Sequence, residues 1–192
     1  MRIGITGGIG SGKSEVVKHL RSLGKYVICA DEVSRQVVMP GEEGADALRR
    51  VFGSSFFLDD GSLDRKKLAD EVFSNDDRLE LLNKTLHPLI LQRIEQYAQQ
   101  GQGCVFIDAA LLIQTGMHKS VDVVWLVVAN KNTRIARVVK RDGLSAAEVE
   151  RRIGSQISDD EMSAYADEII HNDGSLFDLK ERVDELLKKH SL

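Results

Sequence analysis

Runs of apolar residues recur along the chain and predict the strands of a buried sheet. The clearest runs are Arg2–Thr6, Tyr26–Ala30, Cys104–Asp108 and Val123–Val128, and a weaker one is Asp167–His171. Their residues are almost continuously apolar, without the alternation of a half-exposed strand, which is typical of parallel strands covered on both faces. Because the segments between them have helical periodicity, the pattern predicts a doubly wound α/β fold with a five-stranded parallel sheet.

The helical segments carry boundary signals of their own. After Gly12 the apolar positions Val16, Val17 and Leu20 fall on one face of a predicted helix. The last helix is predicted over residues 175–189, where Ser175 is the candidate N-cap and lysines occupy the final turn.

One connection is too long for a simple crossover between strands. Residues 31–103 are mostly helical by pattern, whereas a parallel crossover needs only one helix. We therefore expect a single domain over residues 1–192, with a core of residues 1–30, 104–132 and 165–192. Residues 31–103 would form a helical substrate-binding insertion, and residues 133–164 would form a small, polar lid.

Composition narrows the class of partner. The 192 residues include 26 Lys and Arg against 30 Asp and Glu, which gives a net charge of −4. An acidic balance argues against a general nucleic-acid binder, because phosphate contacts need a basic field. The longest apolar run, Val123–Ala129, is too short to cross a membrane. Cys29 and Cys104 are interpreted as thiols in a reducing compartment. We expect a cytoplasmic protein with small-molecule substrates, either a monomer or a weak homo-oligomer.

A phosphate-binding motif follows the first predicted strand. Residues 7–14, Gly-Gly-Ile-Gly-Ser-Gly-Lys-Ser, match the P-loop pattern G-x-x-x-x-G-K-[ST] and precede a helix, as that motif requires. Its glycines allow backbone N–H groups to point at phosphate oxygens, and the helix N-terminus adds partial positive charge. Lys13 would reach the β- and γ-phosphates, and the Ser14 hydroxyl is placed to ligate Mg²⁺. The motif predicts a nucleoside triphosphate site.

Three classes of protein use such a loop: a nucleotide-dependent switch, an ATP-driven motor and a small-molecule kinase. A guanine-specific switch needs N-K-x-D, and the chain has Asn130-Lys131-Asn132-Thr133 without the final carboxylate. No coupling signature of a motor is present. The sequence therefore favours a kinase, with a nucleotide-binding switch as the weaker alternative.

Two aspartates end predicted strands and are candidates for the chemistry. Asp31 follows the second strand and could accept the proton of an attacking hydroxyl, or could equally be the N-cap of a helix beginning at Glu32. Asp108 ends the third strand, where a carboxylate can hold Mg²⁺ through water, and its alternative role is a cap or turn residue.

Arginines gather on one predicted helix of the lid. Arg134, Arg137 and Arg141 are spaced i, i+3 and i+7 and therefore share a face. In a kinase such a face would close over the phosphates. The alternative is a solvated helix face.

These motifs together resemble the dephospho-CoA kinase family over nearly the whole chain. Six ordered segments carry the resemblance: Thr6–Ser14; Ala30–Asp31 with Arg35; Leu86–Ile90; Asp108–Gly116; Arg141–Ser145 with Arg152, Ile153 and Gln156; and Ala166–Asp167 with Ile170, Asn172 and Gly174. The resemblance implies a three-layer α/β/α fold of the P-loop NTPase type. It also implies transfer of the γ-phosphate of ATP to the ribose 3′-hydroxyl of dephospho-CoA, the last step in making coenzyme A.

The resemblance also implies roles for individual residues. The residues expected to hold ATP are Gly8, Gly10, Ser11, Gly12, Lys13, Ser14, Glu15, Arg137 and Asn172. The base would be Asp31, with Arg35 and His87 facing the acceptor and Lys13 and Arg141 assisting the transfer. Ser14 and Asp108 would bind Mg²⁺. His87 precedes Pro88 and could instead be a structural histidine at a helix kink.

The chain departs from the family pattern at four positions: Glu15 for threonine, Cys29 for aspartate, Ala110 for proline and Gln114 for glutamate. Asp31, the required carboxylate, is present. Acceptor choice depends on an insertion whose pocket the sequence does not reveal, so a kinase of nucleoside monophosphates or other small hydroxyl compounds is the alternative function.

Overall fold

A computed structural model describes all residues, 1–192, and the chain packs as two compact units. Unit 1 comprises Met1–Val27 and Gly101–Leu192, and unit 2 comprises Ile28–Gln100. The lid residues 133–164 belong to unit 1. Unit 2 begins and ends three residues earlier than the insertion expected from the sequence. No helix is both long enough and apolar enough to cross a membrane.

Five parallel strands form the sheet in the order β2-β3-β1-β4-β5. Their bounds are β1 Arg2–Thr6, β2 Tyr26–Cys29, β3 Val105–Asp108, β4 Val123–Val128 and β5 Glu168–His171. The predicted α/β class and five-stranded sheet are confirmed. Strand β1 lies at the centre, with Ile5 paired with Asp108 on one side and with Trp125 on the other.

Three predicted strand limits are wrong by one residue. Ala30 begins helix α2, Ala30–Gln36, because Asp31 and Glu32 in the next positions favour a helical first turn. Cys104 precedes β3, and Asp167 precedes β5. The carboxylate of Asp167 accepts a hydrogen bond from the Val124 amide at 2.8 Å, so this side chain joins the two strands where the ladder begins.

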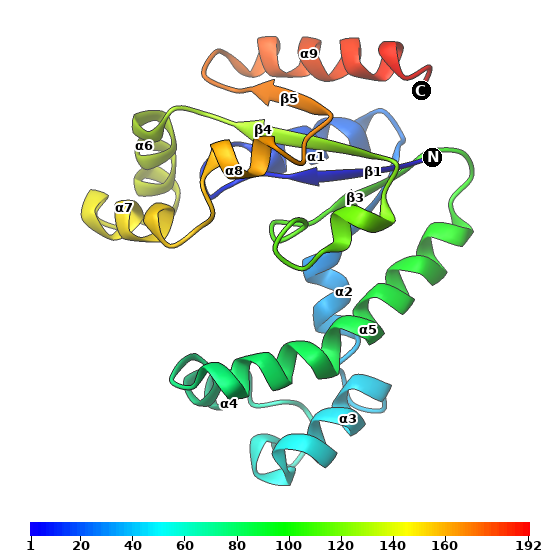
Figure 1. Cartoon of the computed structure of the whole chain (residues 1–192), viewed down its shortest axis with the longest axis vertical. Coiled ribbons are helices and arrows are strands. Elements are labelled where there is room, and N and C mark those ends of the chain that lie inside the picture. Colours follow the sequence, from blue (N-terminus) through cyan, green and yellow to red (C-terminus); the bar gives the residue numbers. More distant parts are fainter. The chain divides into compact units, whose positions relative to one another are not determined.

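Helices cover both faces of the sheet within unit 1. Helix α1, Lys13–Ser22, and helix α9, Leu176–Lys189, pack on one face (Figure 1). The core of this face is formed by Ile3, Ile5, Val16, Val17, Leu20, Phe106, Trp125, Val127, Ile170, Leu179, Val183, Leu186 and Leu187. On the other face, Leu126 and Val128 pack with Met162 of helix α8, Asp159–Ser163. Successive residues of β4 therefore face opposite layers, which explains its continuous apolar run.

The lid consists of helices joined by short turns. Helix α6, Lys131–Asp142, contacts helix α7, Ala146–Gly154, and α8 follows. Serines 145 and 158 cap α7 and α8, and Ser175 caps α9 as predicted, each with a reciprocal carboxylate three residues on. A short 3-10 turn, Met117–Ser120, precedes β4.

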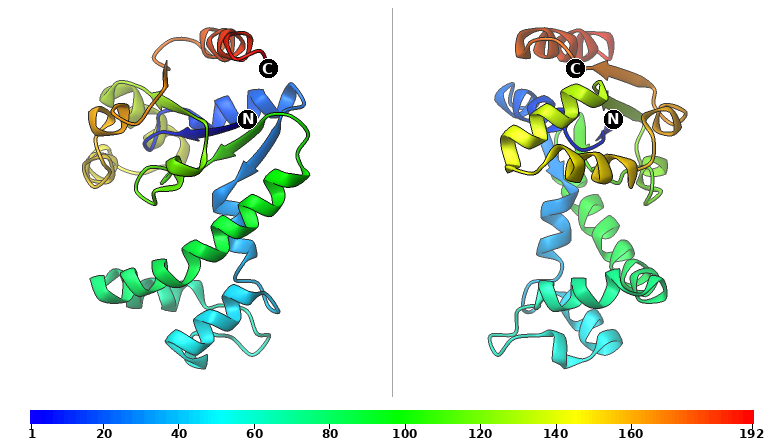
Figure 2. Two further views of the ribbon diagram at one scale, coloured as in Figure 1. Left: turned by 45° about the vertical axis from the view of Figure 1, so that its right-hand side comes forward. Right: turned by 90° about the vertical axis from the view of Figure 1, so that its left-hand side faces the viewer.

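Unit 2 is helical. It contains α2, then α3 Glu43–Phe52, a 3-10 turn Ser54–Phe56, α4 Arg65–Phe73 and α5 Asp76–Gln100. Helix α5 packs against the other three helices, as the two turned views display (Figure 2). Pro88 lies inside α5, where its ring removes one backbone hydrogen bond.

A buried carboxylate ties the end of α9 to the sheet and gives a prediction for stability. Glu168 contacts Lys189 Nζ at 2.5 Å and His190 Nε2 at 3.2 Å. Burial raises the pKa of the Glu168 carboxyl, but the Lys189 ammonium and the His190 ring outweigh it and hold this pKa below its ordinary value. A group whose pKa is lower in the folded than in the unfolded state stabilises the fold. For Glu168 this contribution is fully present above the unfolded-state pKa of about 4.3, and it is lost as the pH falls through the folded-state pKa.

We expect Glu168→Gln to lower the free energy of unfolding by about 1–3 kcal/mol at pH 7. The difference from the wild type should begin to shrink below about pH 4, where the unfolded-state carboxyl takes up a proton. It should vanish once the pH has fallen through the lower folded-state pKa. Urea unfolding at a series of pH values measures this, with exposed Glu181→Gln as the control. A difference independent of pH would contradict the interpretation.

Candidate active site

The phosphate loop joins the central strand to the first helix of unit 1. It runs from Gly7 to Ser14, and α1 begins at Lys13 with Gly12 as its N-cap. The loop is tightened by a hydrogen bond from the Ser11 amide to the Gly8 carbonyl at 3.1 Å. The first amides of a helix lack acceptors within it and carry partial positive charge, so this end of α1 suits an anion.

Lys13 and Asp108 form an ion pair beside this loop. Their side chains are only 16% and 11% exposed. Asp108 lies at the end of β3, where it is paired with Ile5 near the end of the neighbouring strand β1. The carboxylate is therefore an ion-pair partner of Lys13. Its roles as a Mg²⁺ ligand and as a cap or turn residue both stay predictions.

Side chains from distant parts of unit 1 hold the backbone of the loop. Arg134 Nε donates to the Ile9 carbonyl at 2.9 Å, and Gln156 Oε1 accepts from the Ile9 amide at 2.9 Å. Asn172 Nδ2 donates to the Ser11 carbonyl at 2.7 Å. Arg134 and Asn172 are each only 5% exposed. The sequence does not predict these backbone contacts of Arg134 and Gln156, although both residues lie in segments that carry motifs.

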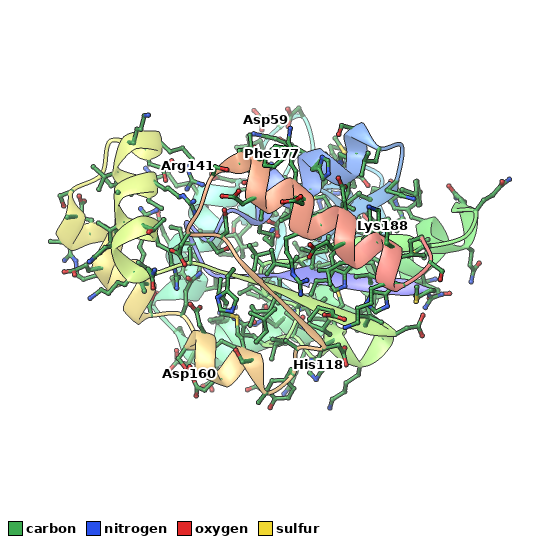
Figure 3. All side chains as sticks on the ribbon, turned by 90° about the horizontal axis from the view of Figure 1, so that it is seen from above. Asp59, His118, Arg141, Asp160, Phe177 and Lys188 are labelled. Carbon is green, nitrogen blue, oxygen red and sulfur yellow. The ribbon has the colours of Figure 1, made fainter.

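The three arginines of α6 occupy different environments despite their shared face. Arg134 is buried and pairs with Asp159 at 3.2 Å. Arg137 is half-buried, and its guanidinium lies 3.5 Å from the Ser11 carbonyl. Arg141, labelled in Figure 3, is exposed and pairs with the adjacent Asp142 carboxylate, which raises the pKa of Arg141. The structure brings Arg134 and Arg137 to the loop, but not Arg141.

The residues expected to bind the acceptor belong to unit 2. Asp31 is exposed in the first turn of α2, whose N-cap is Cys29, so the alternative interpretation of Asp31 as an N-cap is wrong. Arg35 is exposed near the end of the same helix. His87 is half-buried within α5 beside Pro88, so its role stays a prediction.

The donor set of the predicted metal site fits Mg²⁺. Ser14 is exposed in the first turn of α1, and Asp108 supplies a carboxylate at the end of β3. Mg²⁺ prefers hard oxygen ligands and takes one or two of them from the protein, the rest being phosphates and water. No cluster of three or more His, Cys, Asp or Glu side chains offers a complete protein cage.

The comparison with known proteins agrees with this geometry. The family model of dephospho-CoA kinase matches residues 1–178. The chain belongs to the dephospho-CoA kinase family. Dephospho-CoA kinase of Dehalococcoides mccartyi is 42% identical over 97% of this chain and 96% of its own length. The enzyme of Shouchella clausii is 37% identical over 98% of both chains.

Solved structures extend the comparison to the fold. TT1252 from Thermus thermophilus has a TM-score of 0.85 and 34% identity, with 98% of this chain and 97% of its own covered. Dephospho-CoA kinase from Campylobacter jejuni has a TM-score of 0.75 and 27% identity, covering 99% and 96%. Shikimate kinase from Acinetobacter baumannii, at 16% identity and a TM-score of 0.56 with 100% and 94% covered, shares the fold alone. The expected P-loop kinase fold is confirmed.

Gly12 has two reasons to be glycine in this member of the dephospho-CoA kinase family, and both can be tested. Its φ of +98° disfavours other residues, and a Cβ here would lie 1.9 Å from Asn172 Nδ2. We expect Gly12→Ala to lower the free energy of unfolding by more than the ~1–2 kcal/mol of left-handed backbone strain alone. Denaturant unfolding of Gly12→Ala and Gly24→Ala measures the difference.

Gly24 is the matched control because its φ is +73° and no atom lies within 4 Å of a Cβ built there. Equal losses in the two variants would mean that the Asn172 side chain moves aside without cost.

Proposed function

We propose that this protein transfers the γ-phosphoryl group of ATP to the ribose 3′-hydroxyl of dephospho-CoA, giving coenzyme A and ADP. The observation that carries the proposal is the match to the dephospho-CoA kinase family over residues 1–178. The phosphate loop with the largely shielded Lys13 side chain beside it supplies the matching chemistry.

The loop and Lys13 would stabilise the migrating phosphoryl group. In-line phosphoryl transfer passes through a loose transition state whose charge is spread over the equatorial oxygens. Backbone amides of the loop such as those of Gly10 and Gly12 would be fixed donors for those oxygens, and the Lys13 ammonium would join them. Since the amides are oriented before the reaction, they cost no reorganisation during it. Lys13 would exchange Asp108 for the phosphates when ATP binds.

Asp31 would accept the proton of the attacking hydroxyl. The 3′-oxygen forms the new bond to phosphorus, the bond to the ADP oxygen breaks, and the proton passes to the Asp31 carboxylate. Arg35 and His87 would hold the acceptor on unit 2. The exposed position of Asp31 in the first turn of α2 leaves its carboxylate accessible to a substrate.

Ser14 and Asp108 would hold Mg²⁺, which neutralises charge on the β- and γ-phosphates when it is bound. Arg137 would contact the phosphates. When the lid closes, Arg141 would leave Asp142 and contact the phosphates as well, which exchanges one ion pair for another. Closure would exclude water and suppress wasteful hydrolysis of ATP. Neither Cys29 nor Cys104 forms a disulfide, which is consistent with work in a reducing cytoplasm.

One assay tests the acceptor. The purified protein with Mg-ATP should release ADP with dephospho-CoA, and should not do so with coenzyme A, whose 3′-oxygen already carries phosphate. Activity with AMP or CMP and none with dephospho-CoA would make it a nucleoside monophosphate kinase. Slow hydrolysis that ignores every acceptor would identify a nucleotide-binding switch.

A further inference from the structure

Two outward-facing carbonyls of the phosphate loop are held by buried side chains. We propose that Asn172 and Arg134 are positioning residues, which orient the loop amides toward the phosphates of ATP through these carbonyls. The inference rests on the proposed function only in taking ATP as the ligand of the loop.

The planarity of the peptide group links each loop carbonyl to the amide that follows it. In a trans peptide the C=O of one residue and the N–H of the next point in opposite directions. A donor that holds the Ser11 carbonyl outward therefore turns the Gly12 amide inward, and a donor on the Ile9 carbonyl does the same for the Gly10 amide. Because glycine on its own leaves a backbone free to rotate, such loops need external restraint to keep a single arrangement.

Asn172 supplies the restraint at Ser11. It follows β5, and its own amide bonds to the Val128 carbonyl at 2.9 Å, which fixes its backbone to the sheet. Its side-chain Nδ2 lies 2.7 Å from the Ser11 carbonyl, in space that a Cβ at Gly12 would occupy. Its Oδ1 lies 3.5 Å from Arg137. With both polar atoms directed at protein groups and only 5% of the residue exposed, Asn172 is placed to act on the loop and not on the nucleotide.

Arg134 supplies the restraint at Ile9. Its Nε donates to the Ile9 carbonyl at 2.9 Å, and the same guanidinium donates to Asp159 at 3.2 Å and to Gln156 Oε1 at 3.3 Å. Gln156 Oε1 also accepts the Ile9 amide. Both polar groups of Ile9 are thereby bonded to the lid, so the loop and the lid share one hydrogen-bond network.

The test distinguishes whether Asn172 positions the loop backbone or contacts the nucleotide directly. Asn172→Leu keeps the approximate shape and removes the donor without adding charge. Calorimetry of Mg-ATP and of inorganic tripolyphosphate with Mg²⁺ should then give dissociation constants raised about ten- to hundredfold by the same factor, since both ligands need the loop amides. His171→Gln, at an exposed neighbouring position, is the control and should bind both ligands as the wild type does.

Two results would overturn the proposal. If ATP binding weakens while tripolyphosphate binding does not, Asn172 contacts the base or the ribose. If neither weakens, its bond to Ser11 is dispensable. Should Asn172→Leu fail to fold, Arg134→Lys keeps a positive charge opposite Asp159 and loses the simultaneous bonds to Ile9 and Gln156, and the same parallel loss is expected. Since dephospho-CoA is absent from these titrations, a wild type inactive toward that acceptor would defeat the proposed function alone.

Discussion

Replacing Lys13 by alanine is expected to lower kcat by on the order of 10³-fold, because its ammonium would move to the phosphates and stabilise the developing phosphoryl charge. Lys13 is ion-paired with Asp108 and largely shielded from solvent. A charge held in such surroundings is worth more to a transition state than one in water. A coupled assay of ADP formation with saturating dephospho-CoA and a range of ATP concentrations measures kcat and KM separately.

The control for Lys13→Ala is Arg21→Ala, which removes an exposed positive charge from the last turn of the same helix. Its kcat should equal that of the wild type. Unfolding curves for both variants are needed as well, because Lys13→Ala leaves Asp108 without its partner. A well-folded Lys13→Ala that keeps turnover within a few-fold of the wild type would contradict the assignment of the phosphate loop.

The elements that the sequence predicts well are those whose local signals and burial agree. Strand β4 is observed at its predicted limits because its residues are buried on both faces. Helix α9 ends at Lys189 as predicted, and Ser175 caps it with Asp178 as the reciprocal partner. The apolar stripe of α1 packs into the core for the same reason.

The details that the sequence does not predict depend on contacts between distant residues. Ala30 continues an apolar run, yet it begins a helix, since the acidic residues after it determine the local conformation. The arginine spacing on α6 identifies a common face but not that Arg134 becomes buried against Ile9, 125 residues away in sequence. Gln156 and Ile9 are 147 residues apart. Periodicity reports the face of a helix, and only tertiary packing determines what that face meets.

The same limit applies to the acceptor side of the site. The motif resemblance assigns Asp31, Arg35 and His87 to the acceptor, but they lie in unit 2, whereas the phosphate loop lies in unit 1. Their joint role is therefore tested by enzyme kinetics. Asp31 is the residue to replace first, because it is the one assigned a chemical step, the removal of the hydroxyl proton.

Asp31→Asn should lower kcat by about 10²–10⁴-fold, the usual contribution of a positioned general base, while the KM for ATP changes little. Asparagine keeps the size of the side chain and cannot take the proton of the 3′-hydroxyl. The loss should fall on kcat because proton transfer belongs to the transition state and not to nucleotide binding.

Glu32→Gln is the matched control for Asp31→Asn, because it removes an exposed carboxylate from the next position of the same helical turn and should leave kcat unchanged. A general electrostatic effect of α2 would instead slow both variants to a similar extent. If Asp31→Asn turned over within a few-fold of the wild type while the Lys13→Ala variant was inactive, the phosphate side of the mechanism would stand. The base would then have to be sought elsewhere, with His87 as the first candidate, since an imidazole nitrogen can act as a general base.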